Sequence, residues 1–227
     1  GEMNLATVIL RLPVGIARGV TDFLFVPSRG AHPHRIAAWV PSVIDESQPA
    51  AAKPLADLLG QAETVLEFDQ PLHQVALLPQ PWLADLARRI AIDALDWALR
   101  QVVWRQDLEQ LDPYVTEADW QRIYTPPTQG GEPIRRLHRA ADLVQDLQCT
   151  GWNYLERASE TLPRPIARRL LLKCEPVSAP TWLSSSVDDR AIAAQVSRSY
   201  GAWVGSAVPG WSQSLAEVPS RIRGSMS

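Results

Sequence analysis

The sequence LADLARRIAIDALDWALRQVVW runs from Leu83 to Trp104 and contains neither proline nor glycine. At about 100° per residue, its apolar side chains cover more than half of a helical circumference. The charged side chains share one narrow strip, formed by Asp85, Arg89, Asp93, Asp96 and Arg100. A helix with so little polar surface needs neighbours on several sides, so this stretch predicts the central buried helix of the fold. The charges on the strip can pair at a spacing of four residues, and we expect them to face solvent.

Proline occurs 19 times but is also absent from a second long stretch, between Ile134 and Leu162. Since proline disrupts helix interiors, a long helix can form there. Pro133 suits its first turn, and the apolar face from Ile134 to Leu147 is typical of an amphipathic surface helix. The helix can continue toward Leu162 only through Gly151, where we expect a kink or a break.

Shorter helices are predicted on both sides of these two. Thr116 and Asp119 have the spacing of a capping box, and the pair Pro126–Pro127 ends that segment. Three further helices are predicted over Pro54–Leu66, Pro165–Cys174 and Asp188–Val204. Extended structure is expected only over the short stretches Phe23–Val26 and Thr7–Leu10.

These elements predict a mostly α fold, a single compact helical domain around a central buried helix with little or no β-structure. The chain has 227 residues, of which 46% are hydrophobic and 21% charged, as in globular proteins. A net charge of -3 argues against binding to nucleic acid. We find neither an export signal nor the roughly 20 uncharged apolar residues of a membrane span. Together with only two cysteines, Cys149 and Cys174, these features predict a cytoplasmic protein without membrane insertion.

Motifs that would identify a catalytic, cofactor or metal site are missing from the sequence. The glycine pair at 130–131 lacks the lysine and the preceding strand of a phosphate-binding loop. His32 and His34 have no further ligand nearby, whereas a zinc site needs three or four. His138 and Cys149 share a predicted helix but would lie roughly 16 Å apart along it, too far for a catalytic dyad. We therefore predict no catalytic residue, no cofactor and no bound metal.

A cluster of arginines is one candidate for contact with a protein partner. Arg135, Arg136 and Arg139 lie in the first turns of the predicted surface helix, where the helix dipole disfavours positive charge. An acidic partner surface would explain them, because guanidinium groups pair bidentately with carboxylates. Neutralisation by Asp142 and Asp146 within the monomer is the alternative.

The tryptophans are a second candidate, since nine are many for this length and tryptophan is enriched at interfaces. Trp97 and Trp104 belong to the buried side of the central helix, which predicts that both are core residues. Trp182, Trp203 and Trp211 follow a shift in composition toward serine, proline and glycine. We expect these three to be able to dock a partner, with core packing as the alternative.

Several stretches, in one order, resemble a bacterial protein family. LHQVALLPQP (Leu72–Pro81) leads directly into the predicted central helix, and further similar stretches are Arg88–Ile90, Ala98–Arg100, Leu108–Leu111 and Trp120–Ile123. Upstream, the pattern includes Phe23–Pro27, His32–His34 and Trp39–Pro41. Downstream, it includes Gly151–Trp152, Leu155, Pro165 and Arg168–Leu172. This order resembles the SctK (YscK, PscK) family of bacterial type III secretion proteins, over roughly residues 23–176.

The resemblance implies a non-enzymatic adaptor of the cytoplasmic sorting platform of the injectisome. Such an adaptor links the cytoplasmic domain of the inner-membrane ring protein SctD to the pod protein SctQ, and indirectly to the SctL stator and the SctN ATPase. It would lie at the cytoplasmic face of the injectisome base. Residues 1–22 are then an N-terminal extension, residues 23–176 an SctK-like helical domain, and residues 177–227 a C-terminal arm with one helix.

Two other functions stay open from the sequence alone. One is a helical chaperone or regulator that binds a single protein. The other is a small helical enzyme whose site is assembled from scattered residues such as Glu63, Asp69, His73 and His138. A deep polar pocket with a buried carboxylate or histidine would favour the enzyme, whereas two separated surface patches would favour the adaptor.

Overall fold

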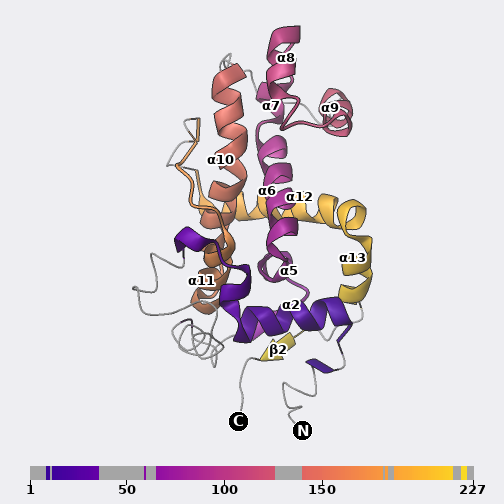
Figure 1. The fold of residues 1–227 in the computed structure, drawn as a ribbon, viewed down its shortest axis with the longest axis vertical. Coiled ribbons are helices and arrows are strands. Elements are labelled where there is room, and N and C mark those ends of the chain that lie inside the picture. Colours follow the sequence, from indigo (N-terminus) through magenta and orange to yellow (C-terminus); the bar gives the residue numbers. More distant parts are fainter. Residues whose placement is uncertain are drawn as a thin grey trace.

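In the computed structural model the described part of the chain is mostly helical, and the molecule is elongated along one axis (Figure 1). The structure describes residues 9–10, 12–35, 59, 65–125, 140–180, 182–183, 187–216 and 221–223. The helices are α2 (Val14–Phe25), the 3₁₀ turn η1 (Pro27–Gly30), α5 (Pro71–Leu77), α6 (Gln80–Ala94), α7 (Asp96–Leu99), α8 (Arg105–Leu111), α9 (Glu117–Tyr124), α10 (Ala140–Ser159), α11 (Arg164–Lys173), α12 (Asp189–Ala207) and α13 (Pro209–Ala216). Two short strands, β1 (Val65–Glu67) and β2 (Arg221–Arg223), pair antiparallel, with Leu66 opposite Ile222.

Three mutually packed helices form the centre of the molecule. The helices α6 and α10 run side by side along the long axis, and α12 crosses both of them (Figure 1). On α6, the side chains of Leu83, Leu86 and Ile90 have no exposed surface. The prediction of a mostly α, single-domain fold around a central buried helix is therefore confirmed, with β-structure limited to one small strand pair in the described part of the chain.

The central helix is shorter than the sequence predicts. The helix α6 ends at Ala94, because the backbone of Leu95 (φ -101°, ψ 7°) leaves the helical conformation. One further turn, α7, is followed by non-helical residues up to Trp104, which is extended and precedes α8. The indole of Trp104, expected in the core, is 73% exposed. The prediction treated residues 83–104 as one continuous helix, which places Trp104 on the buried face. The interruptions at Leu95 and after Leu99 change the direction in which Trp104 points.

The second long helix, α10, does not break at its glycine. It runs continuously from Ala140 to Ser159, and residues 132–139, where it was expected to begin, lie outside the described ranges. A Cβ atom placed on Gly151 would lie 1.8 Å from the carbonyl oxygen of Ala87 on α6. Gly151 is therefore the point of closest approach between α10 and α6, which only a residue without a side chain permits.

The described helices of the segments that the sequence assigned to an extension and an arm contribute to the same core. On α2, Ile16 and Val20 are fully buried in the main hydrophobic cluster, so a boundary after residue 22 would cut through a helix. On α12, Ile192 and Val196 are buried in that cluster as well. Of the stretch Phe23–Val26, expected to be extended, the first three residues complete α2 instead, and Val26 is its C-cap.

Other local predictions have mixed outcomes. The capping box of Thr116 and Asp119 is present at the start of α9, and the predicted helix after Asp188 is α12, which the Asp188 side chain caps. The helix predicted over Pro54–Leu66 lies largely outside the described residues, and its last two residues form part of β1. Within the described ranges, none of the helices combines the length and the apolar character that a membrane crossing requires.

Candidate functional site

The structure cannot place the arginine cluster, because Arg135, Arg136 and Arg139 lie outside the described residues. Their candidate role in binding an acidic partner therefore stays a prediction. Downstream on α10, Asp142 is exposed whereas Asp146 is buried.

The three C-terminal tryptophans are occupied within the monomer. Trp203 and Trp211 are buried in the main core, so the expectation that they dock a partner is wrong. The indole nitrogen of Trp203 donates to Asp85 on α6 (2.7 Å), and that of Trp211 donates to the hydroxyl of Tyr200 (3.3 Å). Both contacts fasten α12 and α13 to the domain.

Trp182, the third candidate, is half-buried and lies between two ring systems. Its ring centroid is 6.3 Å from that of Trp97 and 6.3 Å from that of Tyr154. Its indole nitrogen donates to the hydroxyl of Thr150 (3.3 Å). Trp97 is only partly buried and packs against the core from its edge. Trp182 thus bridges the segment before α12 to α10, and core packing explains it.

The residues considered for an enzyme do not come together in the described structure. Glu63 and His138 lie outside it, and Asp69 is exposed. His73 is buried, and its Nδ1 accepts a hydrogen bond from the backbone N–H of Glu67 (2.9 Å), which fixes the turn before α5. Burial lowers the pKa of His73, despite the nearby carboxylates of Glu67 and Asp69. Its ring is therefore a neutral structural acceptor.

The two other histidines considered, His32 and His34, stack on each other with ring centroids 5.4 Å apart. Among the described residues, no group of three histidine, cysteine, aspartate or glutamate side chains is arranged to hold a metal ion. Both cysteines are free thiols, and Cys174 is fully buried.

The middle of the charged strip, Arg89 and Asp93, is largely covered by α9 and α12, although the whole strip was expected to face solvent. Asp93 pairs with Arg89 one turn before it and with Arg122 on α9. Its second oxygen accepts from the hydroxyl of Ser199 on α12 (2.8 Å). Spacing along one helix reveals that charges can pair, but it does not distinguish a solvent-facing strip from one that binds neighbouring helices.

Asp119 joins the capping box of α9 to this network. It accepts from the backbone N–H and hydroxyl of Thr116 (3.1 and 2.7 Å), and it pairs with Arg88 on α6. Burial would raise the pKa of Asp119, but the hydrogen bonds from Thr116 and Arg88 outweigh it, so that the pKa is lowered. Asp119 is thus held as a carboxylate, and it stabilises both the start of α9 and its contact with α6.

One exposed apolar surface lies where α7 and α8 meet. Val103 and Trp104 are 71% and 73% exposed, and Tyr124 at the end of α9 is half-exposed. The Tyr124 hydroxyl donates to the carbonyl of Val102 (3.0 Å), which ties the end of α9 to the segment that carries Val103 and Trp104. We call Val103, Trp104 and Tyr124 the distal patch.

A second exposed apolar surface lies at the start of α2. Leu10 and Val14 are more than four-fifths exposed and form what we call the basal patch. In Figure 1, α2 lies near one end of the long axis and α8 at the other. The distal and basal patches are therefore well separated, and their apolar side chains are available to contact a partner. Neither patch was identified from the sequence. Helical periodicity placed Trp104 in the core, and no helix was predicted over the residues that form α2.

No protein-family model matches the chain, and no curated protein or solved structure matches it either.

Proposed function

We propose that this chain is a non-enzymatic adaptor of the type III secretion sorting platform, linking the cytoplasmic domain of SctD to SctQ and so, indirectly, to SctL and SctN. The order of stretches that resemble the SctK family supports the identity of the partners. The observation that carries the adaptor role is the pair of separated apolar patches. An adaptor needs two binding surfaces that can be occupied at once, and patches at opposite ends of a rigid helical axis satisfy that need.

The central helices support the same role by their rigidity. The side chains of α6 are paired with α9 and α12, and Gly151 brings α10 into backbone contact with α6. In the native state these contacts set the distance between a partner bound at the distal patch and one bound at the basal patch. Location at the cytoplasmic face of the injectisome base is part of the same proposal.

The test is binding of the purified chain to the purified SctD cytoplasmic domain and to purified SctQ, measured separately by calorimetry. One variant carries Val103→Ser with Trp104→Ser, and another carries Leu10→Ser with Val14→Ser. All four side chains are exposed, so both variants should keep the helical circular dichroism of the parent. Ala202→Ser, at an exposed position of α12, is the matched control.

Each double variant should weaken binding to one partner by about tenfold or more and leave the other unchanged, since apolar anchors dominate interface energies. The variant Arg135→Gln/Arg136→Gln/Arg139→Gln tests the arginine cluster in the same assay. Failure of the parent chain to bind either partner would refute the adaptor. Binding to only one partner would refute it in favour of a chaperone or regulator.

A further inference from the structure

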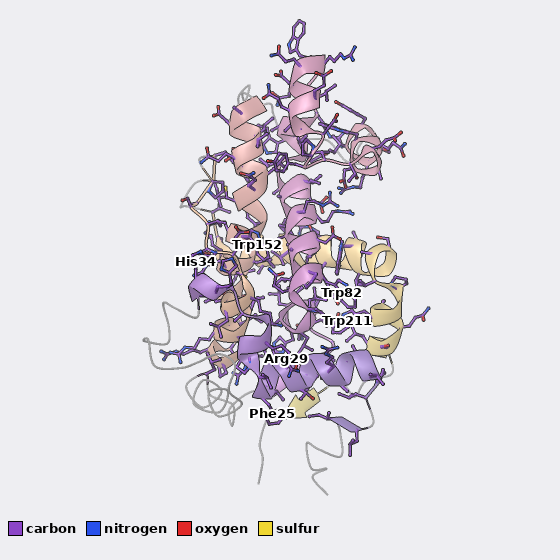
Figure 2. The ribbon with its side chains drawn as sticks, viewed as in Figure 1. Phe25, Arg29, His34, Trp82, Trp152 and Trp211 are labelled. Carbon is purple, nitrogen blue, oxygen red and sulfur yellow. The ribbon has the colours of Figure 1, made fainter. Side chains whose placement is uncertain are left out.

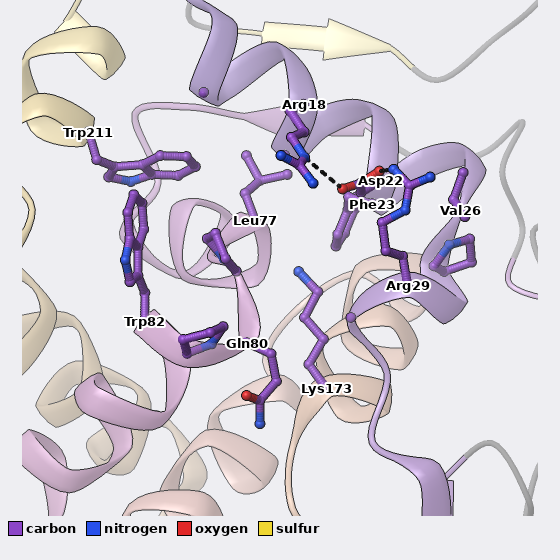
Figure 3. Close-up of a pocket in the computed structure, with 16 residues that line it drawn as sticks. Arg18, Asp22, Phe23, Val26, Arg29, Leu77, Gln80, Trp82, Lys173 and Trp211 are labelled. Atoms are coloured by element: carbon purple, nitrogen blue, oxygen red, sulfur yellow. Dashed lines mark hydrogen bonds and ion pairs between the residues drawn. The ribbon is translucent and has the colours of Figure 1, made fainter.

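A cavity of about 430 Å³ lies between α2 and the turn that joins α5 to α6 (Figure 3). Trp82 and Trp211 form one end, with their rings edge to face and their centroids 5.7 Å apart (Figures 2 and 3). Phe23 and Leu77 contribute further apolar wall. The volume and the mostly apolar lining are those of small-molecule sites.

Lys173, at the end of α11, places a buried ammonium group in this cavity. Its Nζ donates to the carbonyl oxygens of Ala76 (2.7 Å) and Leu78 (3.1 Å), and it lies 5.5 Å from the ring centroid of Phe23. An ammonium group has three N–H donors, so one remains without an acceptor among the described residues. Since these acceptors are neutral carbonyls, no carboxylate of the described residues is in direct contact with the charge.

The rim of the cavity adds further positive charge. Arg18 and Arg29 both pair with the single carboxylate of Asp22, as Figure 3 shows. With Lys173, the lining residues therefore carry three positive charges and one negative charge. An apolar cavity with an unmatched cation at its wall and cations at its rim is complementary to a molecule that is apolar at one end and anionic at the other.

We propose that this cavity binds a small amphipathic carboxylate, whose apolar or aromatic body packs against Trp82 and Trp211 and whose carboxylate accepts hydrogen bonds from Lys173 and Arg29. The carboxylate supplies the acceptor and the negative charge that the buried ammonium lacks. The site goes beyond the adaptor function, and its test does not depend on SctD or SctQ.

The test is calorimetric titration of the full chain with 2-naphthoate. The neutral 2-naphthamide is the matched ligand without the charge, and acetate is the matched ligand without the aromatic group. We expect saturable binding of 2-naphthoate, at least about tenfold weaker binding of the amide, and none of acetate, because hydrogen bonds to charged groups are the stronger ones. No saturable binding of 2-naphthoate at millimolar concentration, or equal affinity for acid and amide, would overturn the proposal.

Variants locate the binding in this cavity. Lys173→Met should abolish binding, but it also leaves two buried carbonyls without their donor and can unfold the chain. Two other variants avoid that problem. Arg29 is more than half exposed, so Arg29→Gln should weaken binding without loss of stability. Gly15 lines the cavity in open space, so Gly15→Leu should block it while the helix keeps its conformation.

Arg105→Gln, which removes one exposed arginine from α8 at the far end of the molecule, is the charge control and should bind like the parent. Unchanged affinity in both Arg29→Gln and Gly15→Leu would show that the ligand binds elsewhere, and would overturn the assignment.

The pH dependence provides an independent readout. Burial lowers the pKa of Lys173 to about 8, and Arg18, Arg29 and Asp22 are the other charged groups that face it. Burial raises the pKa of the adjoining Cys174 to about 12, so that thiol stays protonated in this range. The ammonium binds the anion and the neutral amine does not, so affinity should fall as pH rises from 7 to 9. An affinity that is constant over this range would contradict the role of Lys173.

Discussion

At the scale of single residues, Gly151 limits how closely the two long helices can pack. A methyl group there would overlap the backbone of Ala87, and a backbone oxygen cannot rotate away as a side chain can. We expect Gly151→Ala to lower the free energy of unfolding by about 3 kcal/mol, although alanine favours the helix, because α6 and α10 would have to move apart. Urea denaturation followed by circular dichroism measures the loss.

The matched control for that variant is Gly201→Ala on α12, where an added Cβ meets nothing within 4 Å. Helix propensity alone should make that variant more stable by up to about 1 kcal/mol. If both variants were equally stable, the close approach of α6 and α10 at Gly151 would be wrong.

At the scale of the elements, α9 is held by one carboxylate that caps it and pairs it with α6. Because hydrogen bonds lower the pKa of Asp119 in the folded chain, its contribution to stability is complete above the usual aspartate pKa of about 3.9 and is lost as pH falls from there through the lowered folded-state pKa. We expect Asp119→Asn to cost about 1 to 2 kcal/mol at pH 7 and less at pH 3. Urea denaturation at the two pH values measures this difference.

Glu117→Gln, at an exposed position in the first turn of the same helix, is the control and should change stability little at either pH. A cost of Asp119→Asn that is the same at pH 3 and pH 7 would contradict the lowered pKa.

The elements also show how far the sequence alone could lead. The apolar face of α6, the capping box of α9 and the helix that follows Asp188 were predictable, because each depends on neighbours within one or two helical turns. The partners of Asp93 were not, since Arg122 and Ser199 are distant in sequence and reach it only in the folded chain. For the same reason Lys173, an ordinary residue in the sequence, gave no signal of the cavity that it lines.

At the scale of the whole molecule, the buried apolar residues form two large clusters. The larger contains the buried faces of α2, α5, α11, α12 and the first half of α6, together with the second half of α10. The smaller contains the end of α6, the residues around α7 to α9, and Leu143 and Leu147 at the start of α10. Among the described helices, only α6 and α10 contribute buried residues to both clusters, so the distal end, with its exposed patch, is connected to the rest mainly through these two helices.

This division predicts that the distal end can open while the remainder stays folded, because locally stable units often coincide with such clusters. Leu111 is fully buried in the smaller cluster, and Leu111→Ala should remove about 2 to 5 kcal/mol of its packing. Native-state hydrogen exchange should then accelerate in α8 and α9 but not in α2 or α11. Leu170→Ala, the equivalent change in the larger cluster, should accelerate exchange throughout. If Leu111→Ala also accelerated exchange in α2 and α11 equally, the two clusters would unfold as one unit, and the distal patch would be as rigid as the core that carries it.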